Sequence, residues 1–116
     1  MMRPRRRAQV LLVLVTHPAG RAAGRFAARL VDARLAACVN ILPAAESVFW
    51  WRGKLDRGRE SLLLIKTTAS AYAPLEAAIT RWHPYDVPEV IAVPIMRGSA
   101  PYLAWVKSSV QASRAP

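Results

Sequence analysis

Hydrophobic positions follow two different periods along the chain, and the change from one to the other predicts the secondary structure. Residues 9–16 form a continuous apolar run rich in Val and Leu, which indicates a buried strand. Between residues 20 and 36 the apolar positions recur every three or four residues, which predicts a helix. The expected inner face of this helix comprises Ala23, Phe26, Ala27, Leu30 and Val31.

A second face of the same predicted helix carries Arg21, Arg25 and Arg29. Like charges four residues apart on a helix repel each other. This face is therefore either solvated or in contact with anions.

The middle of the chain has the pattern of a long hairpin. Residues 38–51 predict a second strand, with an irregularity near Pro43, and residues 55–68 predict a third strand with its buried part at 62–65. Arg52-Gly53 between them has turn chemistry. Residues 56–58 are a candidate for a second turn or a bulge.

The last third of the chain predicts a helix, a strand and another helix. Residues 71–82 form the helix, with Ser70 as its cap and Pro74 in its first turn. Residues 87–96 form the strand, where Pro94 requires an edge or a bulge. Ser99 can cap the final helix, whose inward positions are Leu103, Val106 and Val110.

The resulting order, β-α-β-β-α-β-α, predicts an α+β fold of the ferredoxin-like split β-α-β sandwich type, βαββαβ, with an additional C-terminal helix. Two helices would cover one face of the sheet and leave the other face apolar and open. Trp50, Trp51 and the last helix could cover that face in part, and a partner subunit could cover it more completely.

The length of 116 residues fits a single domain, expected over residues 9–112, between a basic flexible tail at 1–8 and a frayed tail at 113–116. The only cysteine, Cys38, excludes an internal disulfide, and its apolar surroundings indicate a buried, inert thiol. The apolar run after the first arginines is short for a signal peptide, and no segment approaches a membrane span. We therefore expect a cytoplasmic protein that does not enter a membrane.

The net charge of +10 has two interpretations: binding to nucleic acid or another anionic surface, or an arginine-rich composition with a basic tail. RNA-recognition motifs share the βαββαβ order and stack bases on aromatic residues of the third strand. Residues 61–66 of this chain contain no aromatic residue, so we expect no specific nucleic-acid partner.

Several short motifs occur in a fixed order along nearly the whole chain. They include residues 35–41 (LAACVNI), 51–54 (WRGK), 65–68 (IKTT), 83–85 (HPY), 87–89 (VPE) and 102–105 (YLAW). In this order and spacing the chain resembles the CutA family of divalent-cation tolerance proteins.

The resemblance implies a ferredoxin-like protomer in a homotrimer similar to the PII signalling proteins. It also implies a role in tolerance or response to divalent metals, copper above all, with a cation or small ligand bound at or between subunits. No nucleophile elbow, P-loop, dinucleotide fingerprint or zinc-protease motif is present, so we expect no enzyme. The alternative is a PII-like regulatory or scaffold trimer that binds a small molecule and has no metal site.

The topology itself places a candidate site at one end of the sheet. The first and fourth strands are antiparallel neighbours in a split βαβ fold, and the second helix ends at the same edge. His17, His83, Asp86 and Glu89 could therefore gather there, and imidazole with carboxylate suits Cu(II) or Zn(II). In the other interpretation, His83 caps the helix C-terminus, where positive charge is favoured.

The predicted metal ligands are His83, Glu89 and His17, of which the resemblance itself supports His83. In the copper-associated bacterial member of the family, a second histidine lies just before the one in the motif and a cysteine lies at the end of the first strand. This chain has Trp82 and Val15 at those positions, and His17 is the candidate replacement. For a small-molecule ligand we expect contacts from His83, Tyr85, Glu89 and Lys66.

Overall fold

A four-stranded antiparallel sheet with the strand order β2-β3-β1-β4 forms the centre of the computed structural model, which describes residues 8–110. Its elements are β1 (Val10–Pro18), α2 (Arg21–Asp32), β2 (Cys38–Trp51), β3 (Lys54–Thr68), α3 (Ala69–Trp82), β4 (Ile91–Pro94) and α4 (Ala100–Ser109). The predicted order of strands and helices is confirmed. The expected tails, 1–8 and 113–116, lie outside the described residues except for residue 8.

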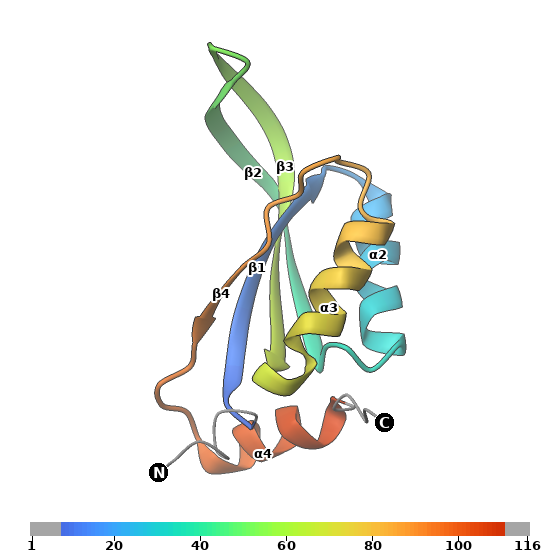
Figure 1. Cartoon of the computed structure of the whole chain (residues 1–116), viewed down its shortest axis with the longest axis vertical. Coiled ribbons are helices and arrows are strands. Elements are labelled where there is room, and N and C mark those ends of the chain that lie inside the picture. The colour runs from blue at the N-terminus through green and yellow to red at the C-terminus, as the bar shows by residue number, and fades with distance from the viewer. Residues whose placement is uncertain (1–7, 111–116) are drawn as a thin grey trace.

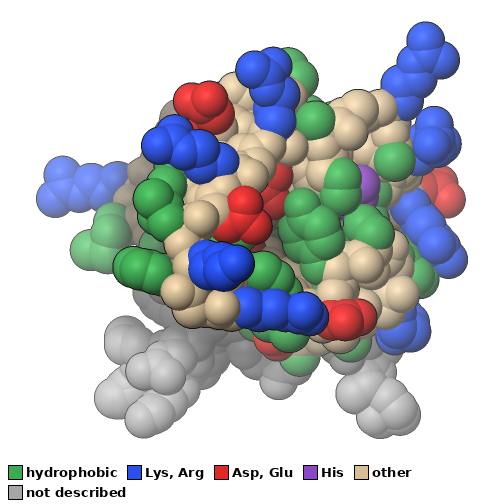
Figure 2. Space-filling model, turned by 90° about the horizontal axis from the view of Figure 1, so that it is seen from above, with side chains coloured by type: hydrophobic (Ala, Val, Ile, Leu, Met, Phe, Trp, Pro, Cys, Tyr) green, Lys and Arg blue, Asp and Glu red, His purple; other side chains and the backbone are tan. Residues whose placement is uncertain are grey.

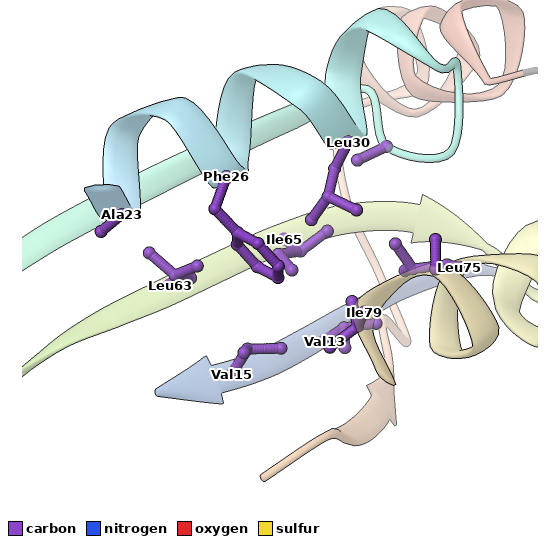
Figure 3. Close-up of a cluster of buried hydrophobic side chains, with 11 residues drawn as sticks. Val13, Val15, Ala23, Phe26, Leu30, Leu63, Ile65, Leu75 and Ile79 are labelled. Carbon is purple, nitrogen blue, oxygen red and sulfur yellow. The ribbon is translucent and has the colours of Figure 1, made fainter. Parts of the chain in front are cut away.

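The core lies between the sheet and the two helices α2 and α3, which cover the same face (Figure 1). Strand β1 pairs with β3 along its whole length, and side chains alternate between the two faces. Figure 3 shows the buried set from strands and helices pointing toward one another: Val13, Val15, Ala23, Phe26, Leu30, Leu63, Ile65, Leu75 and Ile79. Each large aliphatic side chain buried there stabilises the fold by about 1.5–3 kcal/mol.

The opposite face of the sheet is apolar and largely uncovered, as the pattern predicted. We call it the open face and define it by Leu12, Leu14, Leu42, Leu62, Leu64, Ile91 and Val93, which share one side of the sheet by register. Helix α4 covers only one end of the sheet, where Val106 and Val110 pack with Val10. Trp50 and Trp51 do not cover it: they are 73% and 52% exposed.

Strands β2 and β3 form a hairpin that projects beyond the rest of the molecule (Figure 1). Its turn has two residues, Arg52 and Gly53, both with positive φ, at 52° and 78°. Positive φ at both central positions is the signature of the type I′ turn, which matches the twist of paired strands. The irregularity expected near Pro43 is confirmed as a register shift between Leu42 and Ala45.

The prediction of a possible turn or bulge at residues 56–58 was wrong, because β3 continues through these residues without interruption. Asp56, Arg57 and Gly58 each pair with a residue of β2, so the ladder overrides the local turn chemistry.

Several element boundaries also differ from the prediction. Strand β4 has four residues instead of the ten expected at 87–96, and it is an edge strand, as Pro94 required. Pro88 cannot donate to a ladder, which is consistent with the late start. Helix α2 ends at Asp32, and the side chain of Val31 is 36% exposed instead of buried.

Helix α3 starts two residues earlier than expected, at Ala69, with Thr68 as its N-cap residue. Ser70 therefore lies inside the helix and is not its cap. Pro74 lies inside the helix beyond the first turn, where its missing N–H leaves the carbonyl group of Ser70 without an i+4 partner.

Candidate functional site

His83 follows α3 directly and turns its imidazole ring back toward the end of β1. Its Nε2 atom lies 2.7 Å from the carbonyl oxygen of Thr16, and the backbone N–H of Tyr85 lies 3.0 Å from its Nδ1 atom. A carbonyl oxygen only accepts, so Nε2 carries the proton and donates. Nδ1 accepts from Tyr85. Both ring nitrogens of His83 are therefore occupied by hydrogen bonds within the protein.

His17, near the end of β1, lies beside His83 with 5.0 Å between the ring centroids. Its side chain is only 3% exposed, and the ring of Phe26 from α2 packs 4.9 Å away. The Nδ1 atom of His17 lies 3.1 Å from the carbonyl oxygen of Pro18 and must donate to it. The lone pair of neutral His17 consequently lies on Nε2.

Tyr85 links this pair of histidines to the hairpin. Its ring lies 4.8 Å from the His83 ring, and its hydroxyl donates to Oε2 of Glu60 at 2.8 Å. The other oxygen of Glu60, Oε1, accepts from the hydroxyl of Ser47 at 2.6 Å. A chain of hydrogen bonds therefore runs from β1 through His83 and Tyr85 to β3 and β2.

These surroundings change the acid–base chemistry of both residues. Burial lowers the pKa of His83 below its ordinary value, and the positive charge that His17 can carry lowers it further, while the Thr16 carbonyl and Glu60 act in the opposite direction. Burial and the hydrogen bond to Glu60 raise the pKa of Tyr85 to about 12. His83 is thus stabilised as the neutral imidazole and Tyr85 as the neutral phenol.

The predicted meeting of His17 and His83 is therefore confirmed, but the carboxylates do not join them. Asp86 and Glu89 are exposed on the segment between α3 and β4. Within residues 8–110, no group of three or more His, Cys, Asp or Glu side chains is placed to hold a metal ion. Val15 is fully buried in the core, and Trp82 packs against Arg29, so neither position offers a ligand.

Lys66 lies at the other end of β3, away from the histidines, where it pairs with Leu12 and Cys38. Its ammonium group donates to Oδ1 of Asn40 and lies 3.9 Å from the sulfur of Cys38. The prediction of a buried Cys38 was wrong: the side chain is half-buried on the side of the sheet that carries the open face. A second polar cluster therefore exists, made of Cys38, Asn40 and Lys66.

Sequence reasoning missed Glu60, Ser47 and Phe26 as neighbours of the candidate site. Glu60 reaches Tyr85, and Ser47 reaches Glu60, only because of the hairpin register, in which Ser47 pairs with Gly58 and Ala45 with Glu60. Phe26 was predicted as core, which it is, and its ring also lies 5.5 Å from the ring of His83. The helical spacing of Phe26 carried no signal for this contact with His83.

Comparison with known proteins identifies the family. The model for the CutA1 divalent ion tolerance protein matches residues 11–109, which is nearly the whole described chain. The chain belongs to this family. Among curated CutA1 relatives, the chloroplastic protein CutA 1 of Oryza sativa is 47% identical over 89% of this chain. The divalent-cation tolerance protein CutA of Thermus thermophilus is 43% identical over 84% of this chain and 95% of its own length.

Solved CutA1 structures have the same fold. The crystal structure from Oryza sativa superposes with a TM-score of 0.86 at 46% identity, over 89% of this chain and 94% of that one. The Thermus thermophilus structure gives 0.85 at 41% identity, over 88% and 99%. The chain spans only 58% and 56% of the length of the curated CutA relatives from rice and Arabidopsis thaliana.

Proposed function

We propose that this chain acts in divalent-cation tolerance as a homotrimer similar to the PII proteins, and that a cation or small ligand binds between its subunits. The open face carries the argument for assembly. Its leucines are joined by Ile91 at 52% and Val93 at 45% exposure. Soluble monomers rarely leave a contiguous apolar surface across a whole sheet uncovered, and further copies of the chain would cover it.

The cation part of the proposal depends on His17. In the neutral form its Nε2 lone pair is available, whereas His83 could bind Cu(II) or another divalent cation only by giving up one of its two hydrogen bonds. Glu89 is exposed and would have to approach from the segment before β4. The residues of one chain do not fit a complete cation site, so a site of His17, His83 and Glu89 needs further ligands from a neighbouring subunit.

The second candidate is a PII-like trimer that binds a small molecule and no metal. Lys66 supports it, because its ammonium group lies on the side of the sheet that carries the open face. Covering a positive charge with an apolar subunit interface is costly unless an anion or a carboxylate accompanies it. His83, Tyr85 and Glu89 lie at the opposite end, so one ligand would contact them and Lys66 together only where two subunits meet.

We further propose that the chain carries out no catalytic step and that it is located in the cytoplasm. The hydrogen-bond chain through His83 and Tyr85 saturates the imidazole and keeps the phenol protonated, so neither is prepared to take up a proton from a substrate at neutral pH.

Relatives carry different location names: those from rice and Arabidopsis are called chloroplastic, and a structure from Archaeoglobus fulgidus is called periplasmic. Within residues 8–110, none of the helices combines the length and hydrophobicity that a membrane crossing requires.

Native mass spectrometry of the tag-free chain, purified without chelator and titrated with Cu(II) and then Zn(II), tests the proposal. We expect a complex of three chains that takes up one cation per chain or one per complex. A monomer at micromolar concentration would contradict the assembly. A trimer that takes up neither cation would remove the metal site and favour the PII-like alternative.

Two variants refine the result. His17→Ala removes the available Nε2, and His83→Gln keeps a hydrogen-bonding side chain without an imidazole. Loss of uptake in both identifies a site with two imidazoles, whereas loss in His17→Ala alone assigns one imidazole to the cation. Unchanged uptake in both variants would show that the cation binds elsewhere.

A further inference from the structure

The exposed surface of α2 and α3 lies on the opposite side of the molecule from the open face and carries four arginines and two acids, Asp32 and Glu76. Arg21, Arg25 and Arg29 of α2 are exposed, as is Arg81 of α3. We call these four residues the arginine face. Figure 2 shows Lys and Arg side chains along the side of the molecule on which Figure 1 places α2 and α3. Assembly through the open face would therefore leave the arginine face accessible.

The first two arginines of α2, Arg21 and Arg25, lie where they do not stabilise the helix. Arg21 is its first residue and no acidic residue lies in its first turn, although the positive end of the helix dipole favours acids there. Gly20 at the N-cap provides no side-chain hydrogen bond. Successive arginines at four-residue spacing also repel each other. Helix stability therefore gives no reason for Arg21 and Arg25.

Two of the guanidinium groups gather at one indole ring. The Cζ atom of Arg29 lies 3.7 Å from the centroid of the Trp82 ring, and that of Arg81 lies 5.7 Å from it. Each group is attracted by the ring, but two like charges at one ring repel each other. An anion placed between them would remove this repulsion, and arginine pairs of this kind suit phosphate oxygens.

The row on α2 has a defined length and small neighbours. Four residues of helix rise separate successive arginines by about 6 Å, so the three span about 12 Å. Gly24 and Ala28 are exposed on the same helix, and a side chain added at Gly24 would meet nothing within 4 Å. A rigid polyanion can therefore approach the α2 backbone closely along this row.

We propose that the arginine face binds double-stranded nucleic acid through its phosphates, without reading the base sequence. The ring of Trp82 already carries Arg29 and is half-buried, so it is not free to stack on a base as single-strand binding proteins require. The apolar face of α2 is buried in the core, so the helix has no apolar side to insert into a membrane. This function is independent of the cation or ligand proposed above.

Fluorescence anisotropy with a labelled DNA duplex of about 30 base pairs, at about 50 to 200 mM KCl, tests the proposal on the full chain. We expect binding that weakens with salt. The variant Arg21→Gln/Arg25→Gln/Arg29→Gln should lower the slope of log K against log salt by about 2.7, since each lost phosphate contact removes about 0.9. Gln preserves helix propensity, and circular dichroism checks that the variant is folded.

The matched control is Arg57→Gln/Arg97→Gln/Lys107→Gln, which removes the same charge from three exposed positions in other parts of the chain. It should retain the wild-type slope. Equal loss in both variants would overturn the proposal in favour of net charge alone, and retention in both would assign binding to other basic residues. Absence of binding by the wild type, or tighter binding to phosphatidylserine vesicles than to the duplex, also overturns it. If the triple variant fails to fold, Arg25→Gln alone should lower the slope by about 0.9.

Discussion

The hydroxyl of Tyr85 donates a hydrogen bond to Glu60 across 25 residues of sequence, with 2.8 Å between the two oxygens. This bond ties the segment after α3 to the projecting hairpin, and Ser47 completes it from β2 at 2.6 Å. The candidate site is therefore held in place by side chains from β2, from β3 and from the segment after α3.

Removing this link should cost a modest amount of stability. We expect Tyr85→Phe to lower the free energy of unfolding by about 0.5–1.5 kcal/mol, because one partly exposed hydrogen bond is lost while Glu60 keeps Ser47. Urea denaturation at a fixed protomer concentration measures it. In Tyr85→Phe/Ser47→Ala the two losses should be non-additive, since both partners share Glu60. Strict additivity would show that the three residues do not act as one network.

The same bond predicts a dependence on alkaline pH. The pKa of Tyr85 in the folded protein is raised to about 12, above the ordinary value of 10.0, so the folded state holds this proton more tightly than the unfolded state. The resulting stabilisation is complete below pH 10 and is lost as the pH rises toward about 12. Ultraviolet titration of phenolate absorbance should show a late-titrating tyrosine that is missing in Tyr85→Phe.

His83 should contribute more to stability than its position in a loop suggests. We expect His83→Ala to lower the free energy of unfolding by about 2–4 kcal/mol, because it leaves the Thr16 carbonyl and the Tyr85 N–H without their partner and creates a cavity. Thr80→Ala, at an exposed position of α3, is the control and should change stability by less than about 0.5 kcal/mol. A His83→Ala protein as stable as that control would contradict the assigned hydrogen bonds.

The lowered pKa of His83 predicts the opposite pH dependence from that of Tyr85. The unfolded state binds a proton on His83 at a higher pH than the folded state does, so stability rises with pH from the lowered pKa up to about 6.5, the ordinary value. Below the lowered pKa both states are protonated and the penalty is constant. Denaturation of wild type and His83→Gln across this range isolates the effect, which should be absent from the variant.

Leu63 and Leu64 provide a matched test of the two faces of the sheet. Leu63 is fully buried under the helices, whereas Leu64 pairs with Leu14 on the open face. We expect Leu63→Asp to prevent folding, because it places a charge in the core. Leu64→Asp should leave a folded chain that no longer assembles, as read by circular dichroism and by light scattering on a sizing column. A trimeric Leu64→Asp protein would show that the open face is not the interface.

The comparison of sequence with structure shows which features a local pattern can predict. The periods in residues 9–36 predicted β1 and α2 because apolar side chains must face one core, and Pro94 predicted an edge strand because it lacks an N–H group. The turn considered at residues 56–58 did not form because pairing with β2 outweighs local preference. The predicted β4 was too long because residues 87–90 and 95–96 were assigned to a strand from their apolar pattern, whereas only Ile91–Pro94 pair with β1.

The site was predictable only where topology alone decided it. Neighbouring strands and the end of α3 brought His17 and His83 together, as predicted. Glu60 depended on the register of a long hairpin, and its role could not be predicted from spacing. The hydrogen bonds at both ring nitrogens of His83 could not be predicted either, since they depend on the orientation of this one side chain.

The shortness of β4 has a consequence for β1. Main-chain pairing between these strands stops at Leu14 and Ile91, and beyond it the imidazole of His83 receives the N–H of Tyr85 and offers its own N–H to Thr16. The side chain of His83 thus makes the hydrogen bond to β1 that a peptide group of a longer β4 would make. Substitutions in the segment after Tyr85 should therefore leave this contact with β1 in place, whereas loss of this one ring should leave the end of β1 held by its pairing with β3 alone.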